Sequence, residues 1–388
     1  MPKRYARLRL LLVVGALSLG VAVQAQDTLR GQVVDSASMN PLPFVTVFFD
    51  GTTVGSLTTE DGFFALALDR VQLPALLSVS HIGYESWQME VSEAIDVTIF
   101  LKPRKYDIAT IEIEDDDRRA ENVEEFIAQF LGLDKWGTES SISGTEHLFF
   151  ERVNQRRTIQ NARTRMLMNE IPVHLENAEW SEDGNDLSYD IKKSFTVRAN
   201  APLLVDLPHL GYKVQVDLQD FHIDYDQGLR VYFGTFFFMP YEEAGERPRA
   251  KHRRNRERAY FGSIQHFLRA LYGNRLYEEG YATYDLDLGL PYDMELDAHL
   301  SEEIDGTRYL QGLEGLNIGI KYCHNQAGRP LYPDRVNGLS TRSTLIINTN
   351  AAIIRADGTF ADRRLLFGGN MGAKAAAWMV PADYQPRF

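Results

Sequence analysis

Short runs of alternating apolar and polar residues, separated by turn residues, fill the chain from 27 to 102. The first run ends at Asp35, and a proline-flanked segment leads into a second run at 44–49. A turn containing Gly62 joins two further runs, because glycine readily adopts the positive φ that a tight turn needs. A period of two is typical of β-strands, so this segment is predicted to fold as a β-sandwich.

The predicted strand at 44–49 is apolar on both faces. Its side chains alternate between two sets, Phe44, Thr46 and Phe48 on one face and Val45, Val47 and Phe49 on the other. A strand of this kind is expected to be covered by other structure on both sides.

Two later stretches carry apolar residues at the three- and four-residue spacing of an amphipathic helix. The first lies at 120–132 and ends on Gly132, and the second lies at 255–279 and is followed by Gly280. Glycine is common just past the last turn of a helix. Because a helix of this length gains most of its stability from packing, the apolar stripe of the first helix is expected to dock onto the sheet that follows it.

Alternation returns between 142 and 240, most regularly at 187–199, and a hairpin is expected around 226–228. One strand of this hairpin is rich in aromatic residues, namely Phe233, Phe236, Phe237 and Phe238. These rings are interpreted as core packing or as a platform on which a carbohydrate stacks. Further strands are expected at 313–322, 343–348 and 351–354.

Composition changes between 103 and 119, where a cluster of acidic residues indicates a solvated linker. The patterns therefore predict a mainly β protein with α+β character. It comprises a sandwich at 27–102, the acidic linker at 103–119, and a larger β-rich domain at 120–388 that contains the two helices.

Four segments of the first module carry a family resemblance. GQVVD, PLPFVTVFFDGTTVGSLTTEDGFFAL, LLSVSHIGYESWQMEV and VTIFLKP, in this order, resemble the carboxypeptidase regulatory-like domain. The most specific part is TTEDGFF followed by HIGYES. The resemblance implies a seven-stranded, transthyretin-like (prealbumin-like) sandwich, and it is specific for fold rather than for function.

In true carboxypeptidases this module sits beside a zinc peptidase, whose His-x-x-Glu and later His ligands have no counterpart in this sequence. No carboxypeptidase activity, metal or cofactor is therefore expected. A second tract, NRERAYFGSIQHFLRALYGNRLYEEGY, together with LGYKVQVDLQDF and VPADYQP, is similar to exported bacterial proteins in which such a sandwich precedes a β-rich region of uncharacterised function. That similarity implies no particular reaction.

The first 25 residues have the pattern of a secretory signal peptide. Basic residues precede an apolar run at 10–23, and Val23 and Ala25 supply the small residues of a cleavage site after Ala25. The run is shorter than the roughly 20 residues of a membrane-spanning helix. We therefore expect an exported protein of the periplasm or outer membrane, with no transmembrane segment in the mature chain.

Cleavage would take the formal net charge from −13 to −17, because four basic residues are lost. So acidic a protein is a poor general binder of nucleic acid, which is not an expected partner. The single cysteine, Cys323, cannot form an internal disulfide and is interpreted as a small buried residue.

A basic run stands out against this acidic background. It contains Arg247, Arg249, Lys251, Arg253, Arg254, Arg256 and Arg258, with Glu257 as the one acidic residue. The run either binds an anion, such as a lipid phosphate or an acidic glycan, or pairs with carboxylates of the protein itself. Arg253, Arg254, Arg256 and Arg258 are retained as candidate binding residues.

His266 and Arg269 lie three residues apart on the second predicted helix, and Ser263 precedes His266 by the same spacing. The pair Ser263 and His266 resembles half of a nucleophilic pair, but no nucleophile-elbow motif accompanies it. No catalytic residue is assigned, and His266 and Arg269 are candidates for binding.

Acidic residues after 284 alternate with apolar ones and would share one strand face. They are Asp285, Asp287, Asp293, Glu295 and Asp297. A solvated face is one interpretation, and a pair of acids for glycoside cleavage is the other. A concave pocket holding two or more of them would favour an enzyme.

The first hypothesis is a noncatalytic cell-envelope protein that binds or scaffolds a partner protein or a glycan. The alternatives are a hydrolase of envelope glycans or peptides that uses the carboxylates after residue 284, and a structural accessory of an outer-membrane complex.

Overall fold

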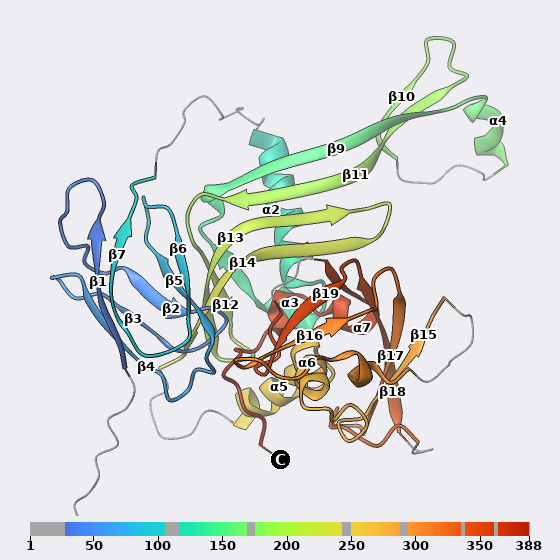
Figure 1. Cartoon of the computed structure of the whole chain (residues 1–388). Helices are drawn as coiled ribbons and strands as arrows, with labels where there is room; N and C mark the ends of the chain where they lie inside the picture. Colours follow the sequence, from blue (N-terminus) through green and yellow to red (C-terminus); the bar gives the residue numbers. More distant parts are fainter. Residues whose placement is uncertain are drawn as a thin grey trace, which may run out of the picture.

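The computed structural model describes residues 28–104, 116–168, 175–242, 250–287, 294–334, 338–360 and 364–387. The predicted signal peptide, most of the acidic linker and the start of the basic run lie outside these residues. The fold is mainly β with few helices, as predicted, and it has three parts (Figure 1). None of the helices within the described residues is long and apolar enough to span a bilayer.

The first part is the predicted seven-stranded sandwich. One sheet has the order β4-β1-β7 and the other β3-β2-β5-β6. The strands are β1 (Thr28–Asp35), β2 (Thr46–Phe49), β3 (Gly55–Leu57), β4 (Phe63–Ala67), β5 (Ala75–Ser80), β6 (Trp87–Val91) and β7 (Asp96–Leu101). The core between the two sheets includes the almost fully buried Leu29, Val47, Leu77 and Ile99. The period-two pattern therefore arises from a core that lies between two sheets.

The second part is a seven-stranded sheet with helices on one face. Its main order is β10-β11-β13-β12-β8, with β14 paired to β13 and β9 paired to β11. The strands are β8 (Ser141–Ser143), β9 (Leu148–Ile159), β10 (Glu176–Trp180), β11 (Leu187–Ala199), β12 (Leu203–Leu207), β13 (Tyr212–Asp224) and β14 (Leu229–Pro240). A single-turn 3₁₀ segment, η2 (Thr145–His147), precedes β9.

Helix α2 (Asp116–Leu131) packs on this second sheet through Phe126 and Phe130, whose rings meet Phe221 edge-on. It corresponds to the helix predicted at 120–132, and Gly132 follows it with φ 98°. The short helix α3 (Lys135–Glu139) comes next and is capped by Asp134, whose carboxylate accepts from the Gly137 N–H.

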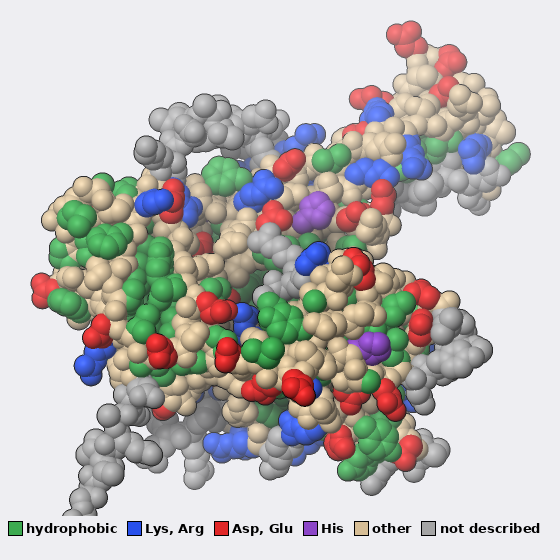
Figure 2. All heavy atoms as spheres, viewed as in Figure 1, with side chains coloured by type: hydrophobic (Ala, Val, Ile, Leu, Met, Phe, Trp, Pro, Cys, Tyr) green, Lys and Arg blue, Asp and Glu red, His purple; other side chains and the backbone are tan. Residues whose placement is uncertain are grey.

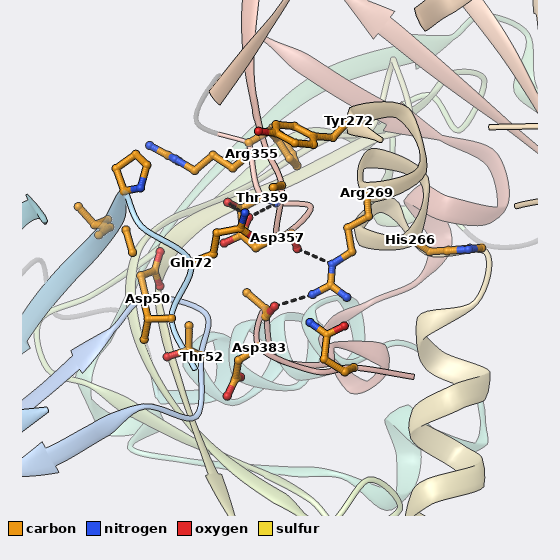
Figure 3. A pocket seen from close by; sticks show the side chains of 18 of the residues that line it. Asp50, Thr52, Gln72, His266, Arg269, Tyr272, Arg355, Asp357, Thr359 and Asp383 are labelled. Atoms are coloured by element: carbon orange, nitrogen blue, oxygen red, sulfur yellow. Dashed lines mark hydrogen bonds between the residues drawn. The ribbon is translucent and has the colours of Figure 1, made fainter. Parts of the chain in front are cut away.

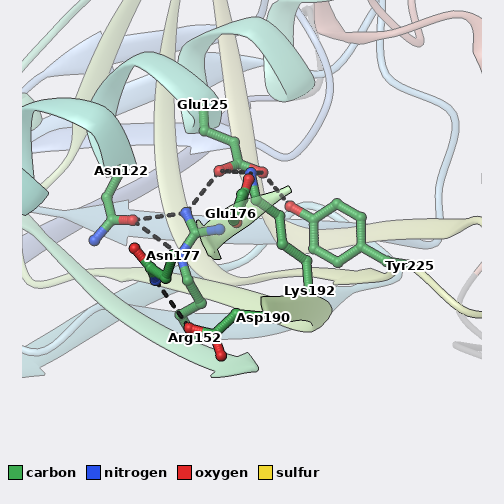
Figure 4. A network of polar contacts seen from close by, with 8 residues as sticks. All are labelled: Asn122, Glu125, Arg152, Glu176, Asn177, Asp190, Lys192 and Tyr225. Atoms are coloured by element: carbon green, nitrogen blue, oxygen red, sulfur yellow. Dashed lines mark hydrogen bonds and ion pairs between the residues drawn. The ribbon is translucent and has the colours of Figure 1, made fainter. Parts of the chain in front are cut away.

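Strands β9 and β11 continue beyond the sheet as a long two-stranded arm (Figure 1). Strand β10 and helix α4 (Ala162–Leu167) lie at its far end. At the base of the arm Glu125 of α2 accepts hydrogen bonds from Arg152 Nη2 at 2.6 Å, from Lys192 Nζ at 3.2 Å and from the Tyr225 hydroxyl (Figure 4). This polar network ties β9 and β11 to α2 and to the residue that follows β13.

Burial of Glu125 opposes its ionisation, but the hydrogen bonds from Tyr225 and Arg152 outweigh burial, and the pKa of the carboxyl is lowered. Glu125 is therefore the anionic centre of the network.

The third part is C-terminal and has its own core around α6. One sheet has the order β15-β17-β18-β20, and β16 pairs with β19. Its strands are β15 (Tyr281–Asp285), β16 (Thr307–Gln311), β17 (Asn317–His324), β18 (Leu339–Ile347), β19 (Ala351–Arg355) and β20 (Leu365–Gly368). Its short helical segments are η3 (Leu296–His299), α7 (Gly369–Ala373) and η4 (Ala376–Trp378). The region from 120 onward thus contains two hydrophobic cores.

The prediction of one helix at 255–279 was wrong. Two helices occupy this stretch, α5 (Ala250–Tyr260) and α6 (Ile264–Tyr272). Gly262 breaks them with φ 69°, and a Cβ there would lie 2.8 Å from the Tyr322 ring. Ser263 begins α6 as its N-cap, accepting from the His266 N–H at 3.1 Å. The apolar stripe runs across the break, which is why its period suggested one helix.

Candidate functional site

The three parts meet at a turn of the sandwich, between β2 and β3. Gly51 N–H donates to Phe236 O at 2.7 Å, and Phe238 N–H donates to Thr52 O at 3.0 Å. The carboxylate of Asp50 also accepts from Phe236 N–H at 2.8 Å. The turn therefore pairs with the outer edge of β14 as a short strand would.

The C-terminal tail closes on the same turn from the other side. Ala382 N–H donates to Gly51 O at 2.6 Å, and Asp383 accepts from the Thr53 N–H at 3.0 Å and from its hydroxyl. Arg70 of the sandwich lies 3.7 Å from the Asp383 carboxylate. Segments from both ends of the chain are thus held together by hydrogen bonds.

Two adjoining cavities open beside this junction, one of about 620 Å³ and one of about 390 Å³. Both are lined by Asp50, Phe233, Gly234, Thr359 and Phe360. We call them together the cleft, and we call the larger cavity its polar half and the smaller its apolar half. In the space-filling view the surface is hollowed between the sandwich and the C-terminal part (Figure 2).

Two carboxylates in the polar half retain free acceptor capacity. Asp50 uses one oxygen for Phe236 N–H, and Asp357 uses one oxygen for the N–H and hydroxyl of Thr359 (Figure 3). Within the described part of the chain, no side chain donates a hydrogen bond to the second oxygen of either carboxylate. Because a carboxylate can accept about four hydrogen bonds, this half suits a ligand that donates them.

The cations near the polar half are already engaged. Arg355 Nη2 contacts the Glu90 carboxylate at 2.9 Å, and Arg70 faces Asp383. Burial raises the pKa of Asp50 to about 6, and the negative charge of Asp357 acts in the same direction, whereas the N–H groups of Phe236 and Gly51 and the charge of Arg355 oppose the shift. A further positive group placed beside Asp50 would also oppose it.

Arg269 borders the polar half, but the protein's own backbone uses its donors. Its guanidinium donates to Asp357 O at 2.9 Å and to Ala382 O at 2.6 Å (Figure 3). It also donates to Tyr384 O at 2.9 Å. This predicted binding residue therefore fastens the C-terminal tail to α6. The geometry gives it a positioning role, and its contact with a ligand stays a prediction.

His266 is buried and points away from Asp50 and Asp357 (Figure 3). Its Nδ1 lies 3.1 Å from the Gly262 nitrogen and 2.7 Å from the Tyr281 hydroxyl, and its Nε2 lies 3.2 Å from Glu279. Because a backbone N–H can only donate, Nδ1 accepts and the ring proton sits on Nε2, facing Glu279. Burial lowers the pKa of His266, which favours this neutral form.

Ser263 does not face the ring of His266 as a nucleophile would. Its hydroxyl oxygen accepts from the backbone N–H of His266, so the three-residue spacing of Ser263 and His266 is that of a helix N-cap. The buried contacts of His266 join α6 to β15.

The apolar half lies on the other side of β14. Tyr232 and Phe236 of β14 face Phe367, Met379 and other residues of the C-terminal part across it. Of the predicted aromatic group, Phe233, Phe236 and the buried Phe238 border the apolar half, whereas Phe237 stacks on Phe48. The four rings therefore do not form one continuous platform.

The arginines of the basic run lie on α5, away from the cleft. Arg256 donates to Leu210 O at 2.8 Å and to Gly211 O at 3.2 Å, and Arg258 lies over the rings of Trp136 and Trp378. Arg253 and Arg254 are exposed, with no ion pair or hydrogen bond to the described residues. The structure does not gather these residues with His266 and Arg269 around one cavity.

The predicted acidic residues after 284 also occupy different places in the structure. Asp285, Glu295 and Asp297 line a separate hollow of about 1280 Å³ beside β15. Asp287 instead holds Asn317, with its Oδ1 2.8 Å from the Asn317 Nδ2. Asp293 lies outside the described residues. A concave site with several carboxylates therefore exists, as the enzyme alternative requires.

The central residues of the cleft, Asp50 and Asp357, were not among the predicted site residues. Each starts an Asp-Gly turn, and the turns themselves are visible in the sequence. Gly358 has φ 80°, and a Cβ there would lie 2.5 Å from Gln265 O. The sequence predicts each of the two turns. It does not predict that the two turns lie side by side, because that depends on packing between distant segments.

Comparison with known proteins identifies the first module. Residues 29–112 match the family described as the CarboxypepD_reg-like domain. No curated protein matches the chain.

Proposed function

Because residues 29–112 form a carboxypeptidase regulatory-like domain, we propose that the chain is a noncatalytic binding protein of the cell envelope, with the cleft as its binding site. Its ligand is part of a partner protein or a glycan. The observation that carries this proposal is a cleft whose walls come from the sandwich, the second sheet and the C-terminal tail, fixed by backbone hydrogen bonds. A preformed concave site that combines apolar walls with placed polar groups is the usual form of a ligand-binding site.

The proposal includes export of the chain across the inner membrane. The basic start, the apolar run at 10–23 and the small residues before position 26 support cleavage after Ala25. The mature chain would then reside in the periplasm or at the outer membrane, where a partner protein or a glycan of the envelope is available.

The assignment of the cleft as the binding site can be tested by filling the cleft with a larger side chain. Thr359 lines both halves, so Thr359→Arg should obstruct the cleft. The substitution removes the hydrogen bond from the Thr359 hydroxyl to Asp357 but leaves the backbone hydrogen bonds of the junction in place. Thr158→Arg is the matched control, because Thr158 is exposed on the arm. Immobilised chain 26–388 should retain the same envelope component with the unaltered sequence and with Thr158→Arg, and lose it with Thr359→Arg. Equal retention by all three proteins would contradict the assignment of the cleft.

A second candidate is a hydrolase of envelope glycans or peptides, favoured by the hollow that holds Asp285, Glu295 and Asp297. Asp285→Asn and Glu295→Gln should then abolish release of sugar or peptide fragments from isolated envelope material. If the chain instead co-purifies with an outer-membrane complex and binds no glycan or peptide, the structural accessory role takes precedence.

A further inference from the structure

Strand β14 has an open edge facing the cleft. Along its length it pairs with β13, from Tyr212 opposite Pro240 to Asp224 opposite Leu229. Its other edge is covered at Phe236 and Phe238 by the sandwich turn. No other strand of the described chain pairs with this edge.

The part of the edge that no strand of the described chain covers includes Arg230, Tyr232 and Gly234. Hydrogen bonding alternates along an antiparallel strand, and Phe236 and Phe238 bond outward. The register of this pair shifts opposite Phe233 and Gly234, where β13 carries one extra residue and β14 carries none. The alternation along β14 itself is therefore unbroken, and the N–H and C=O groups of Arg230, Tyr232 and Gly234 point away from β13. These groups border the cleft, since all three residues line its apolar half.

The two halves of the cleft lie on opposite faces of this edge. Tyr232 and Phe236 face the apolar half, and Thr235 of the opposite face lines the polar half. Successive side chains of a β-strand point to opposite faces of the sheet. A strand laid along 230–234 would therefore send alternate side chains into the two halves.

We propose that the cleft binds an extended segment of a partner polypeptide, which adds as a strand to the outer edge of β14 at residues 230–234. This inference rests on the proposed function and commits it to a peptide rather than a glycan. The sandwich turn at 50–52 already makes the same kind of backbone bonds two residues further along the edge, so the added strand continues an existing ladder. In strand addition, backbone bonds supply affinity and side-chain pockets supply selectivity.

The two halves define the sequence that fits. Alternate residues of the segment are apolar and enter the apolar half beside Tyr232, Phe367 and Met379. The intervening residues are polar, with a basic side chain opposite Asp50 and Asp357. That preference follows from the remaining acceptor capacity of the two carboxylates and from the engagement of the nearby arginines.

The probe is a pool of blocked heptapeptides in which Val or Ile alternates with Lys, Thr or Ser. The strongest binder to chain 26–388 is then resynthesised with one backbone N-methyl group at a time. Methylation of alternate amides, which face β14, should weaken binding at least tenfold, and methylation of the intervening amides should change it less than threefold. A uniform effect, or no binder at about 1 mM peptide, overturns strand addition.

Amide hydrogen exchange supplies an independent readout. Peptide binding should slow exchange at Tyr232, whose N–H points outward, and leave Val231 unchanged, because by the same alternation its N–H points toward β13. Thr359→Arg should remove this protection, and Thr158→Arg should keep it. Peptide binding without protection at Tyr232 would refute the inference.

The outcomes separate the two proposals. If an envelope oligosaccharide binds the unaltered chain, is lost with Thr359→Arg and displaces the peptide pool without any alternating N-methyl pattern, the cleft remains a binding site and strand addition is wrong. If neither peptide nor oligosaccharide binds, both proposals fail.

Discussion

Phe48 of β2 stacks on Phe237 of β14, with ring centroids 5.2 Å apart and ring planes at 25°. This contact explains why β2, which forms the later part of the strand predicted at 44–49, is apolar on both faces. Phe44 lies before β2 with φ 56° and is 63% exposed, so its predicted place on a covered face was wrong. One face of β2 fills the sandwich core, and the other packs on the second sheet. Gly55 leaves room for the stack, because a Cβ at that position would lie 2.5 Å from the Phe237 ring.

Removing one ring should therefore loosen the junction that forms the cleft. We expect Phe237→Ala to lower the free energy of unfolding by about 3 to 5 kcal/mol, the range for buried phenylalanine, because Phe237 is 9% exposed. Phe100→Ala is the control, since Phe100 is 46% exposed on β7 and should lose far less. Urea unfolding of both variants is the measurement, and equal stabilities would contradict the role assigned to the stack.

Arg269 offers a test of positioning against direct binding. Arg269→Lys keeps the positive charge but cannot reproduce the planar set of donors that holds three backbone carbonyls. We expect a loss of about 2 to 4 kcal/mol in unfolding free energy and faster proteolysis of the C-terminal tail. Arg275→Lys is the control, because the Arg275 side chain is 60% exposed. Weaker ligand binding at unchanged stability would instead assign Arg269 to the ligand.

The sequence predicted elements whose signals are local. The sandwich followed from strands of period two with glycine turns, and α2 followed from its apolar stripe and Gly132. The break at Gly262 was missed because Tyr260 and Phe261, which precede it, stand at helical spacing from the apolar residues of α6. A positive φ at one glycine, enforced by the Tyr322 ring, outweighs that periodicity.

The cleft could not be predicted from the sequence, for a different reason. Asp50 and Asp357 were each visible as the start of a turn, and nothing in either turn indicates the other. They meet because Phe48 docks on Phe237 and because Arg269 binds the carbonyl of Asp357. Contacts between distant segments of this kind leave no periodic pattern in the chain.

Glu125 should make the attachment of the arm dependent on pH. Its pKa is lowered in the folded protein, so the unfolded chain binds more protons as the pH falls. The stability it supplies is present above 4.5, the ordinary pKa of a glutamate, and is lost as the pH falls through the folded value. Glu125→Gln should cost about 2 kcal/mol at pH 7, and the difference from the unaltered chain should shrink below pH 4.5.

Glu151→Gln is the control for this prediction. Glu151 lies on the same arm, but its side chain is 67% exposed and its nearest cation, Arg198, is 3.8 Å away. Exposed pairs contribute little to stability. A pH-independent difference between Glu125→Gln and the unaltered chain would argue against the ionised network.

Asp50 should change the pH dependence of stability in the opposite direction to Glu125. Its pKa is raised from 3.8 to about 6, mainly by burial, so the folded protein binds more protons than the unfolded chain between these values. The stability of the neutral form is fully present below pH 3.8 and is lost as the pH rises through 6. The shift corresponds to about 3 kcal/mol at pH 8.

Asp50→Asn removes the charge but keeps an oxygen that can accept from Phe236 N–H. The variant should therefore be more stable than the unaltered chain by up to about 3 kcal/mol at pH 8, with a gap that closes near pH 4, as measured by urea unfolding across this range. Asp61→Asn, at an exposed turn, should show no such trend. A lysine-containing peptide should bind the unaltered chain more tightly as the pH rises through 6, because ionised Asp50 attracts its ammonium group, and Asp50→Asn should weaken that dependence. If Asp50→Asn is less stable than the unaltered chain at pH 8, the carboxyl is not held in the buried, charge-disfavouring setting described for the cleft.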